Sequence, residues 1–217
     1  MKSGDKAQDK SGWLDTIKTL FIAGLIAISF RSVIAEPFNI PSGSMVPTLL
    51  VGDYLFVSKF SYGYSRHSFP FSAAPIANRV MASTPERGDV AVFRLPSNVS
   101  VDYIKRVVGL PGDRIQVKSG ILHINGQAVE RRLLGNGNIV SGQTSLITYR
   151  YEEVFPGGHR HIIQEVSDNQ IFDNTPELTV PDGHYFMMGI TAIIHAIAAL
   201  LVLVLCRLRI LSVGQSF

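Results

Sequence analysis

This chain of 217 residues has only one cysteine, few charged residues and a small net charge. The single cysteine, Cys206, excludes an intrachain disulfide, so cysteine usage does not identify the compartment. The net charge of +3 is too small to argue for a nucleic-acid partner. Charged residues make up only 17% and hydrophobic residues 46%, with a mean hydropathy of +0.22. This balance is oily for a soluble protein and indicates at least one membrane element.

The longest uncharged run near the N-terminus is short. Residues 19–30 carry no charge, whereas crossing ~30 Å of hydrocarbon takes about 20 residues. A transmembrane anchor over 13–35 is long enough if its charged residues, such as Arg31, reach towards the two interfaces. The lysines that precede it place residues 1–12 in the cytoplasm by the positive-inside rule. We therefore expect an anchor, with a cleaved signal peptide as the alternative.

The exported part, residues 36–189, is expected to be mainly β. Three turn signals separate short runs of strand-forming residues: Ser119-Gly120, Asn125-Gly126 and Pro156-Gly157-Gly158. Strands are predicted over 54–57, 90–93, 114–118, 121–124, 127–129, 149–155, 159–166 and 185–188. Residues 69–82 are expected to form an irregular loop. The fold class is therefore mainly β, with irregular antiparallel sheets in a barrel-like or sandwich-like arrangement after an N-terminal transmembrane helix.

Two motifs carry candidate catalytic residues. Pro41–Thr48 reads PSGSMVPT and places Ser44 just after the membrane segment. Tyr103–Asp113 reads YIKRVVGLPGD and contains Lys105 among apolar neighbours. A serine hydroxyl is a poor nucleophile until a base takes its proton. A lysine serves as that base only if burial lowers its pKa, ordinarily ~10.4.

The surroundings of Ser44 also offer hydrogen-bond donors for an oxyanion. The Ser42 hydroxyl and the backbone N–H of Ser44 are the candidates, since Gly43 lets the chain bend between them. Taken alone, the first motif is more typical of a plain turn, and Lys105 of a solvated strand residue. Their occurrence together behind a membrane anchor favours a catalytic serine-lysine pair.

A pair of histidines is the other motif with possible chemistry. His159 and His161 fall on one face of a predicted strand, a geometry that can bind a metal ion. No third ligand is evident, so we expect no metal site.

These residues resemble the type I signal peptidase family, the membrane-bound serine proteases that remove signal peptides from exported proteins. The matching stretches follow the family's order: Ser42–Thr48, Gly52–Lys59, Arg87–Val90, Tyr103–Asp113 and Gly183–Gly189. The resemblance implies that Ser44 is the nucleophile and Lys105 the general base. It also implies that Ser42 and Ser44 supply the oxyanion hole.

The resemblance further implies the substrate and the location. Substrates would be signal peptides of exported preproteins with small side chains at the first and third positions before the cut, because shallow pockets exclude larger ones. The family fold is largely β, with a hydrophobic surface that sits on the lipid bilayer. We therefore expect a single-pass protein of the bacterial inner (cytoplasmic) membrane, with its N-terminus inside and its catalytic domain on the periplasmic face. No cofactor, metal or nucleic acid is expected.

The resemblance stops after Gly189. The family continues there with a polar box similar to Asp-Asn-Arg-Asp-Asn-Ser-x-Asp-Ser-Arg, whereas residues 190–199 read ITAIIHAIAA. Residues 190–217 therefore form an aberrant apolar tail. Its uncharged run from Ile190 to Cys206 predicts a second transmembrane helix.

We interpret this tail as the product of a one-base deletion in the gene. Residues 190–199 can be encoded, with each codon chosen from its synonyms, as ATA ACC GCG ATA ATT CAC GCG ATA GCC GCG. One G placed before this string makes it read Asp-Asn-Arg-Asp-Asn-Ser-Arg-Asp-Ser-Arg, the missing box. In the family, serine and acidic residues of the box hold the catalytic lysine. We therefore expect the chain as written to be poorly active or misfolded.

Two other functions stay open beside a signal peptidase. One is a catalytically dead, membrane-anchored relative that binds exported chains without cutting them. The other is a serine-lysine peptidase of narrow specificity that processes a pilus or conjugation protein.

Overall fold

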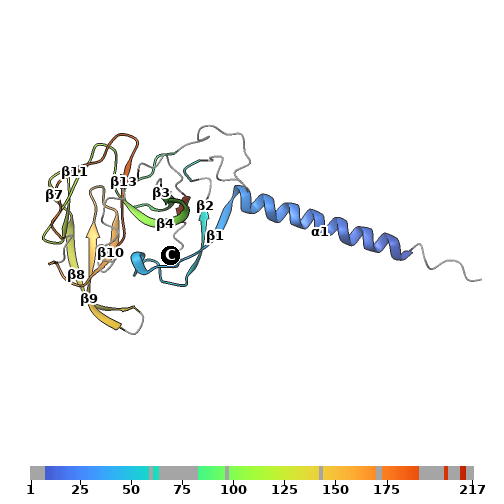
Figure 1. The fold of residues 1–217 in the computed structure, drawn as a ribbon, viewed down its shortest axis with the longest axis horizontal. Helices are drawn as coiled ribbons and strands as arrows, with labels where there is room; N and C mark the ends of the chain where they lie inside the picture. The colour runs from blue at the N-terminus through green and yellow to red at the C-terminus, as the bar shows by residue number, and fades with distance from the viewer. Residues whose placement is uncertain are drawn as a thin grey trace, which may run out of the picture.

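The computed structural model describes residues 8–58, 61–63, 83–95, 98–141, 144–169, 173–190, 203–204 and 211–213. A long helix stands apart from a β-rich part (Figure 1). The helix is α1, Gln8–Val33. The β-rich part consists of antiparallel strands in three sheets, so the predicted fold class is confirmed.

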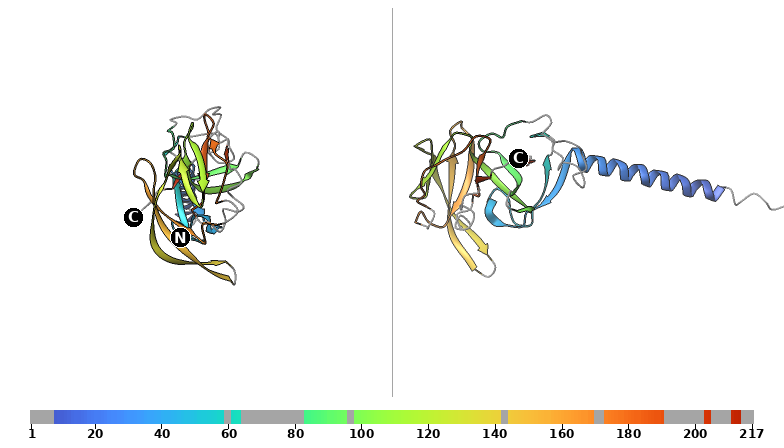
Figure 2. Two further views of the ribbon diagram at one scale, coloured as in Figure 1. Left: turned by 90° about the vertical axis from the view of Figure 1, so that its left-hand side faces the viewer. Right: turned by 45° about the horizontal axis from the view of Figure 1, so that its top comes forward.

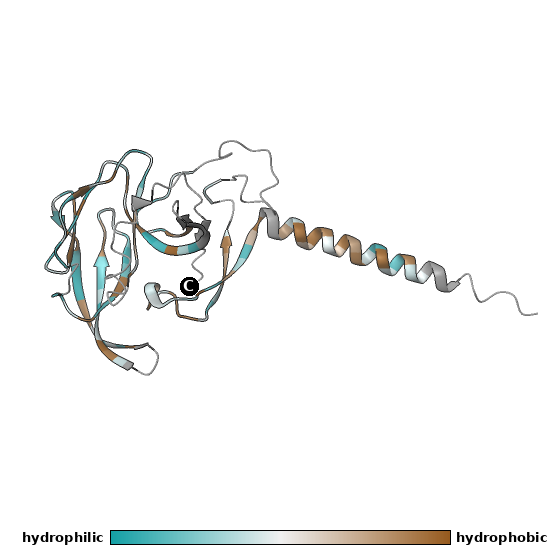
Figure 3. Cartoon of the chain, in the orientation of Figure 1, coloured by the Kyte–Doolittle hydropathy of each residue, from teal (hydrophilic) through white to brown (hydrophobic). Residues whose placement is uncertain are grey.

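Helix α1 exposes apolar side chains over most of its length (Figure 3). The stretch Gly12–Phe30 is long and apolar enough to cross a membrane, and 0% of it is buried. Trp13, Phe21 and Ile26 are among its exposed residues. The predicted anchor over 13–35 overlaps this stretch, although α1 ends at Val33 and strand β1 begins at Ala35. Such a helix is also compatible with a signal sequence, so the anchor stays a prediction.

The largest sheet has seven strands, in the order β1-β2-β14-β3-β4-β12-β13. Its strands are β1 Ala35–Asn39, β2 Tyr54–Ser58, β3 Val90–Leu95, β4 Asn98–Gly109, β12 Tyr185–Met188, β13 Leu203–Val204 and β14 Leu211–Val213. Strand β4 lies between β3 and β12, with Ala91 opposite Lys105 and Met188 opposite Arg106. This central strand therefore fixes the position of the candidate base.

Two smaller sheets complete the β-rich part. One has the order β11-β5-β6-β7, formed by Leu178–Thr179, Arg114–Lys118, Ile121–Ile124 and Gln127–Ala128. The other has the order β10-β9-β8, formed by Arg160–Glu165, Thr144–Val154 and Glu130–Ser141. The long β8–β9 hairpin projects from the body of the molecule (Figure 2).

The turns predicted from sequence are found where expected. Ser119 and Gly120 have φ values of 47° and 74°, and Asn125 and Gly126 have φ values of 56° and 83°. Positive φ at both central residues is the signature of the type I′ hairpin turn, which matches the twist of the strands it joins. The turn at Pro156-Gly157-Gly158 joins β9 to β10. The predicted strands at 54–57, 90–93 and 185–188 are likewise confirmed as β2, β3 and β12.

Some elements differ from the sequence prediction or lie beyond it. Strand β1 was not predicted, because Ala35–Asn39 lacks an alternating pattern and contains Pro37. The predicted loop at 69–82 lies outside the described residues. Most of the predicted second membrane helix also lies outside them. Of the tail, Leu203–Val204 pairs with β12 and Leu211–Val213 lies between β2 and β3.

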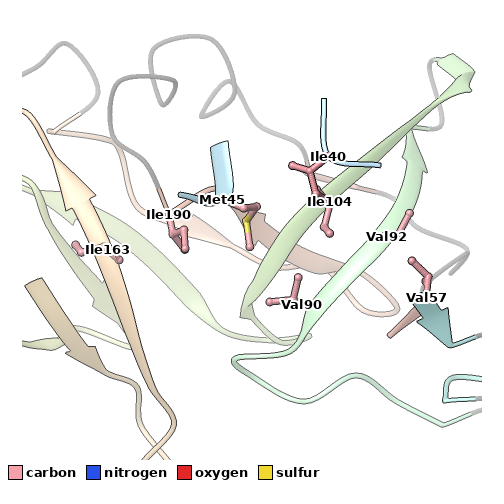
Figure 4. Packing of buried hydrophobic residues seen from close by; sticks show 8 residues of the cluster. All are labelled: Ile40, Met45, Val57, Val90, Val92, Ile104, Ile163 and Ile190. Carbon is pink, nitrogen blue, oxygen red and sulfur yellow. The ribbon is translucent and has the colours of Figure 1, made fainter. Parts of the chain in front are cut away.

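A hydrophobic cluster supports the short 3-10 turn η1, Gly43–Met45, which contains Ser44. Figure 4 shows this cluster, with Met45 pointing among side chains from the large sheet and from β10. Its members are Ile40, Met45, Val57, Val90, Val92, Ile104, Ile163 and Ile190. Full burial of a methionine side chain stabilises by roughly 1.5–3 kcal/mol, so Met45 anchors the turn to the sheet.

Candidate active site

Ser44 lies in a turn whose backbone is held from two sides. The Val46 N–H donates to the Gly43 carbonyl at 3.1 Å, and the Ile190 N–H donates to the Ser44 carbonyl at 2.9 Å. Met45 is 0% exposed beside it. Ser44 itself is buried, so its hydroxyl is fixed within the protein rather than freely solvated.

Lys105 reaches this serine from the central strand. Its Nζ lies 2.5 Å from the Ser44 Oγ, although the two residues are 61 positions apart in the sequence. The Lys105 side chain is buried, which long charged side chains avoid unless they are paired or neutral. The structure thus brings together the two residues that the sequence predicted to act together.

Burial also changes the acid-base behaviour of Lys105. It lowers the pKa of the Lys105 amine to about 8 from an ordinary value of 10.5. The difference corresponds to roughly 3 kcal/mol of bias towards the neutral form. Desolvation is its cause, and no carboxylate among the described residues contributes to the shift. A neutral amine at hydrogen-bond distance from a serine hydroxyl has the geometry of a general base and its nucleophile.

Ser42 lies next to the pair. Its Oγ is 3.5 Å from the Ser44 Oγ, at the outer limit of a hydrogen bond. Ser42 is exposed and precedes η1 in extended backbone, with no capping hydrogen bond from its side chain. Its hydroxyl is therefore not engaged in capping the turn and faces the same region as the Ser44 Oγ.

Gly189 is a site residue that sequence reasoning did not single out. A Cβ at this position would lie 2.8 Å from the Ser44 carbonyl oxygen and 3.3 Å from the Lys105 Nζ. The first distance is closer than real Cβ atoms approach such an oxygen, so only glycine fits without displacing the turn. In the sequence Gly189 is only the last residue of a motif. Its position beside Ser44 and Lys105 depends on the pairing of β12 with β4, which the sequence does not show.

The other side of β4 carries a separate polar group. Arg106 lies on the face opposite Lys105, as strand alternation predicts, and contacts Gly88 and His159. His161 places its Nε2 3.2 Å from the Glu153 Oε2. The two histidines thus contact Arg106 and Glu153, and among the described residues no cluster of three or more metal-ligating side chains occurs.

Comparison with known proteins identifies the family of this chain. The family model described as signal peptidase, peptidase S26, matches residues 13–193, a range that includes Ser42, Ser44, Lys105 and Gly189. The chain belongs to the S26 signal peptidase family. The match ends shortly after Gly189, where the resemblance to the family's sequence pattern also ends.

Individual proteins with similar sequences support the same family assignment. The chain is 40% identical over 172 residues to "Signal peptidase I" of Rickettsia typhi, an alignment that covers 76% of this chain and 64% of the relative. It is 38% identical over 196 residues to "Signal peptidase I" of Rickettsia akari, which covers 87% of this chain and 71% of the relative. The chain thus spans slightly less than two thirds of the length of the Rickettsia typhi peptidase.

Proposed function

We propose that this chain is a membrane-bound serine endopeptidase that cleaves signal peptides from exported preproteins. The contact of 2.5 Å between the Lys105 Nζ and the Ser44 Oγ is the observation that carries the proposal. In this contact the Ser44 hydroxyl meets the Lys105 amine, and burial lowers the pKa of that amine to about 8. Membership of the S26 family supports the same reaction. Serine-lysine pairs are established variants of the serine-histidine-aspartate triad.

The reaction follows from the roles that these groups take. The neutral Lys105 amine accepts the Ser44 proton while the Oγ attacks the scissile carbonyl carbon. The Ser42 hydroxyl and the Ser44 backbone N–H donate to the resulting oxyanion. Protonated Lys105 then gives its proton to the leaving amine, which releases the mature protein and leaves an acyl-enzyme. Lys105 then takes a proton from the water that attacks the ester carbonyl and passes it to the Ser44 Oγ as the ester C–O bond breaks. The signal peptide leaves with a free carboxyl end, and Ser44 and neutral Lys105 are restored.

The substrate and the location complete the proposal. Helix α1 anchors the chain in the inner membrane with its N-terminus inside, and the catalytic domain lies on the periplasmic face. Large apolar side chains in the segment that follows the Ser44 turn are exposed by more than half: Leu50 53%, Val51 62%, Tyr54 82% and Phe56 68%. Contact with the bilayer would cover them and bring Ser44 close to the end of a signal peptide. We expect the substrates to have small side chains at the first and third positions before the cut.

Cleavage of a preprotein by the purified full chain in detergent micelles tests the proposal. Ser44→Ala and Lys105→Ala remove the nucleophile and the base, and each is expected to lower kcat/KM by about 10³-fold or more. Ser145→Ala and Lys118→Ala are the matched controls, because both residues are exposed on strands outside the large sheet. Full activity in Ser44→Ala would refute the assignment of the nucleophile.

A catalytically inactive relative is the second candidate, and the tail favours it. Residues 190–217 lack the family's polar box, and the family match ends at residue 193. Such a protein would bind preproteins through the same surface without cutting them. Binding of a preprotein with equal affinity by the parent and by Ser44→Ala, with no product from either, would support this function over the peptidase.

A further inference from the structure

Arg106 is the most deeply buried charged side chain described in the structure, at 1% exposure. Its NH1 group donates to the Gly88 carbonyl at 2.5 Å and lies 3.1 Å from the His159 Nε2. Among the described residues its Nε has no hydrogen-bond partner. A buried cation with few partners depends strongly on those it has, because an unpaired buried charge is costly. The contact with His159 is therefore more than incidental packing.

This contact fixes the protonation state of His159. A guanidinium group only donates hydrogen bonds, so the His159 Nε2 must be the acceptor. The imidazole therefore carries its single proton on Nδ1 and is neutral, an assignment that follows from the hydrogen bond. A proton on Nε2 would direct an N–H at the Arg106 cation, so protonated His159 cannot keep this bond.

The half-buried His159 ring is also packed against Phe155 and Gly88. Phe155 stacks on it with ring centroids 6.2 Å apart and 20° between the planes. On another side the ring approaches Gly88 so closely that a Cβ there would overlap it. A side chain at position 88 would displace the ring from this position, so Gly88 is required for the contact with Arg106.

The same contacts lead to the strand that carries Lys105. The Gly88 N–H donates to the Val107 carbonyl at 2.8 Å, and the Val107 N–H donates to the Asp89 carbonyl at 2.8 Å. Arg106 therefore joins the turn at Gly88, the ring of His159 and strand β4 immediately beside Lys105. A shift of β4 at Arg106 moves the neighbouring Lys105 relative to Ser44.

We propose that His159 is a positioning residue, which in its neutral form holds Arg106 and thereby the segment of β4 that presents Lys105 to Ser44. Protonation of His159 breaks this contact and places two cations side by side. The effect on catalysis rests on the proposed peptidase function, whereas the effect on β4 does not.

The charges around His159 favour its neutral state. Burial lowers the pKa of His159 below its ordinary value of 6.5, and the nearby Arg106 and His161 lower it further. Asp89 acts in the opposite direction but does not reverse the shift. Asp89 and Glu153 both lie close enough to act on Arg106, and the Glu153 Oε2 lies 3.2 Å from the His161 Nε2. The contact is therefore intact at neutral pH and is lost on acidification.

The stability of the folded chain should follow this titration. Because the folded pKa lies below 6.5, the unfolded chain binds more protons as the pH falls through that value. The folded state is consequently destabilised below this pH. Burial raises the pKa of Glu165 to about 8, which has the opposite effect on stability in this range. Comparison of variants that all retain Glu165 isolates the contribution of His159.

Thermal unfolding of the full chain in detergent micelles, from about pH 8 to about pH 5, tests the contact. His159→Gln supplies an uncharged acceptor for Arg106, and we expect it to remove much of the acid destabilisation seen in the parent. His123→Gln is the control, because His123 lies on β6 in a different sheet. An unchanged pH dependence in His159→Gln would overturn the proposal.

Nuclear magnetic resonance of the parent with ¹⁵N-labelled histidine provides an answer even if His159→Gln does not fold. The His159 Nε2 should carry no proton at neutral pH, and the ring should titrate below 6.5. A proton on Nε2, or titration at or above that value, would contradict the inference.

Preprotein cleavage tests the link to Lys105. Titration of Lys105 alone makes kcat/KM fall about tenfold per pH unit on the acid side, and loss of a second required group steepens this to about a hundredfold. We expect the steeper fall in the parent at low pH and the shallower one in His159→Gln. Equal shallow slopes would refute the positioning role. A parent without cleavage at any pH would count against the peptidase function, while the unfolding measurement would still decide the role of His159.

Discussion

The Nζ of Lys105 lies 2.5 Å from the Oγ of Ser44, and both side chains are buried. A protonated lysine in this position would carry an uncompensated charge away from water. Burial therefore favours the neutral amine, which is the form that accepts a proton from serine. Burial thus accounts for the lowered pKa, and the contact with the Ser44 Oγ supports the proposed reaction.

The pH dependence of cleavage should report this lysine. Because the pKa of Lys105 is about 8, kcat/KM should rise with pH up to about that value and then level off. Lys105→Arg should be inactive across the whole range, since a guanidinium is not deprotonated in proteins. An activity that levels off at or below neutrality in the parent would show that another group is the base.

The free energy of unfolding should also rise with pH because of Lys105. The folded pKa of Lys105 is below its ordinary value of 10.5, so the unfolded state binds more protons between about 8 and 10.5. Raising the pH through this window should therefore remove a destabilisation due to Lys105. Lys105→Met should lack that part of the pH dependence in denaturant unfolding.

Ser42→Ala should slow the chemistry while leaving substrate binding almost unchanged. Its Oγ lies 3.5 Å from the Ser44 Oγ, beside the position at which negative charge develops. Removal of one oxyanion donor typically lowers kcat by about 10²–10³-fold. Steady-state kinetics of Ser42→Ala against Ser145→Ala measures the effect, and Ser42→Thr should recover part of the rate. An unchanged kcat in Ser42→Ala would exclude its hydroxyl from the oxyanion hole.

Gly189→Ala should impair catalysis more than folding. The added methyl group would push on the Ser44 carbonyl at 2.8 Å and approach the Lys105 Nζ at 3.3 Å. Displacement of catalytic groups by about 1 Å can cost on the order of 10²-fold in rate. Gly109→Ala is the matched control, because its Cβ would meet Phe186 at 2.9 Å in the core instead of the pair. Similar losses of kcat/KM in the two variants, relative to their losses of stability, would contradict a specific role for Gly189.

Restoring the reading frame after Gly189 should raise activity. The variant replaces residues 190–199 by Asp-Asn-Arg-Asp-Asn-Ser-Arg-Asp-Ser-Arg and continues in the new frame. It supplies the polar groups that support the lysine in the family. We expect faster preprotein cleavage and a more cooperative unfolding transition than in the parent. Sequencing the gene gives an independent check, because codons that do not fit the shifted box would exclude a one-base deletion.

Local sequence patterns were sufficient for much of the sheet structure. Asn125-Gly126 and Ser119-Gly120 predicted turns because a tight hairpin requires positive φ at both positions, a preference that resides in these residues alone. Strand β1 was not predicted, since Ala35–Asn39 becomes a strand through its pairing with Tyr54–Ser58. Extended structure of that kind depends on a partner that is distant in the chain.

The sequence by itself determined the family and the identities of Ser42, Ser44 and Lys105, because motif order and residue chemistry are read along the chain. Only the tertiary structure decided that Ser44 and Lys105 are in contact, that Gly189 leaves room for them, and that His159 accepts a hydrogen bond from Arg106. The physical reason is that burial and cross-strand pairing join residues far apart in the sequence. They set the pKa of Lys105 and the tautomer of His159, which neither residue's immediate neighbours specify.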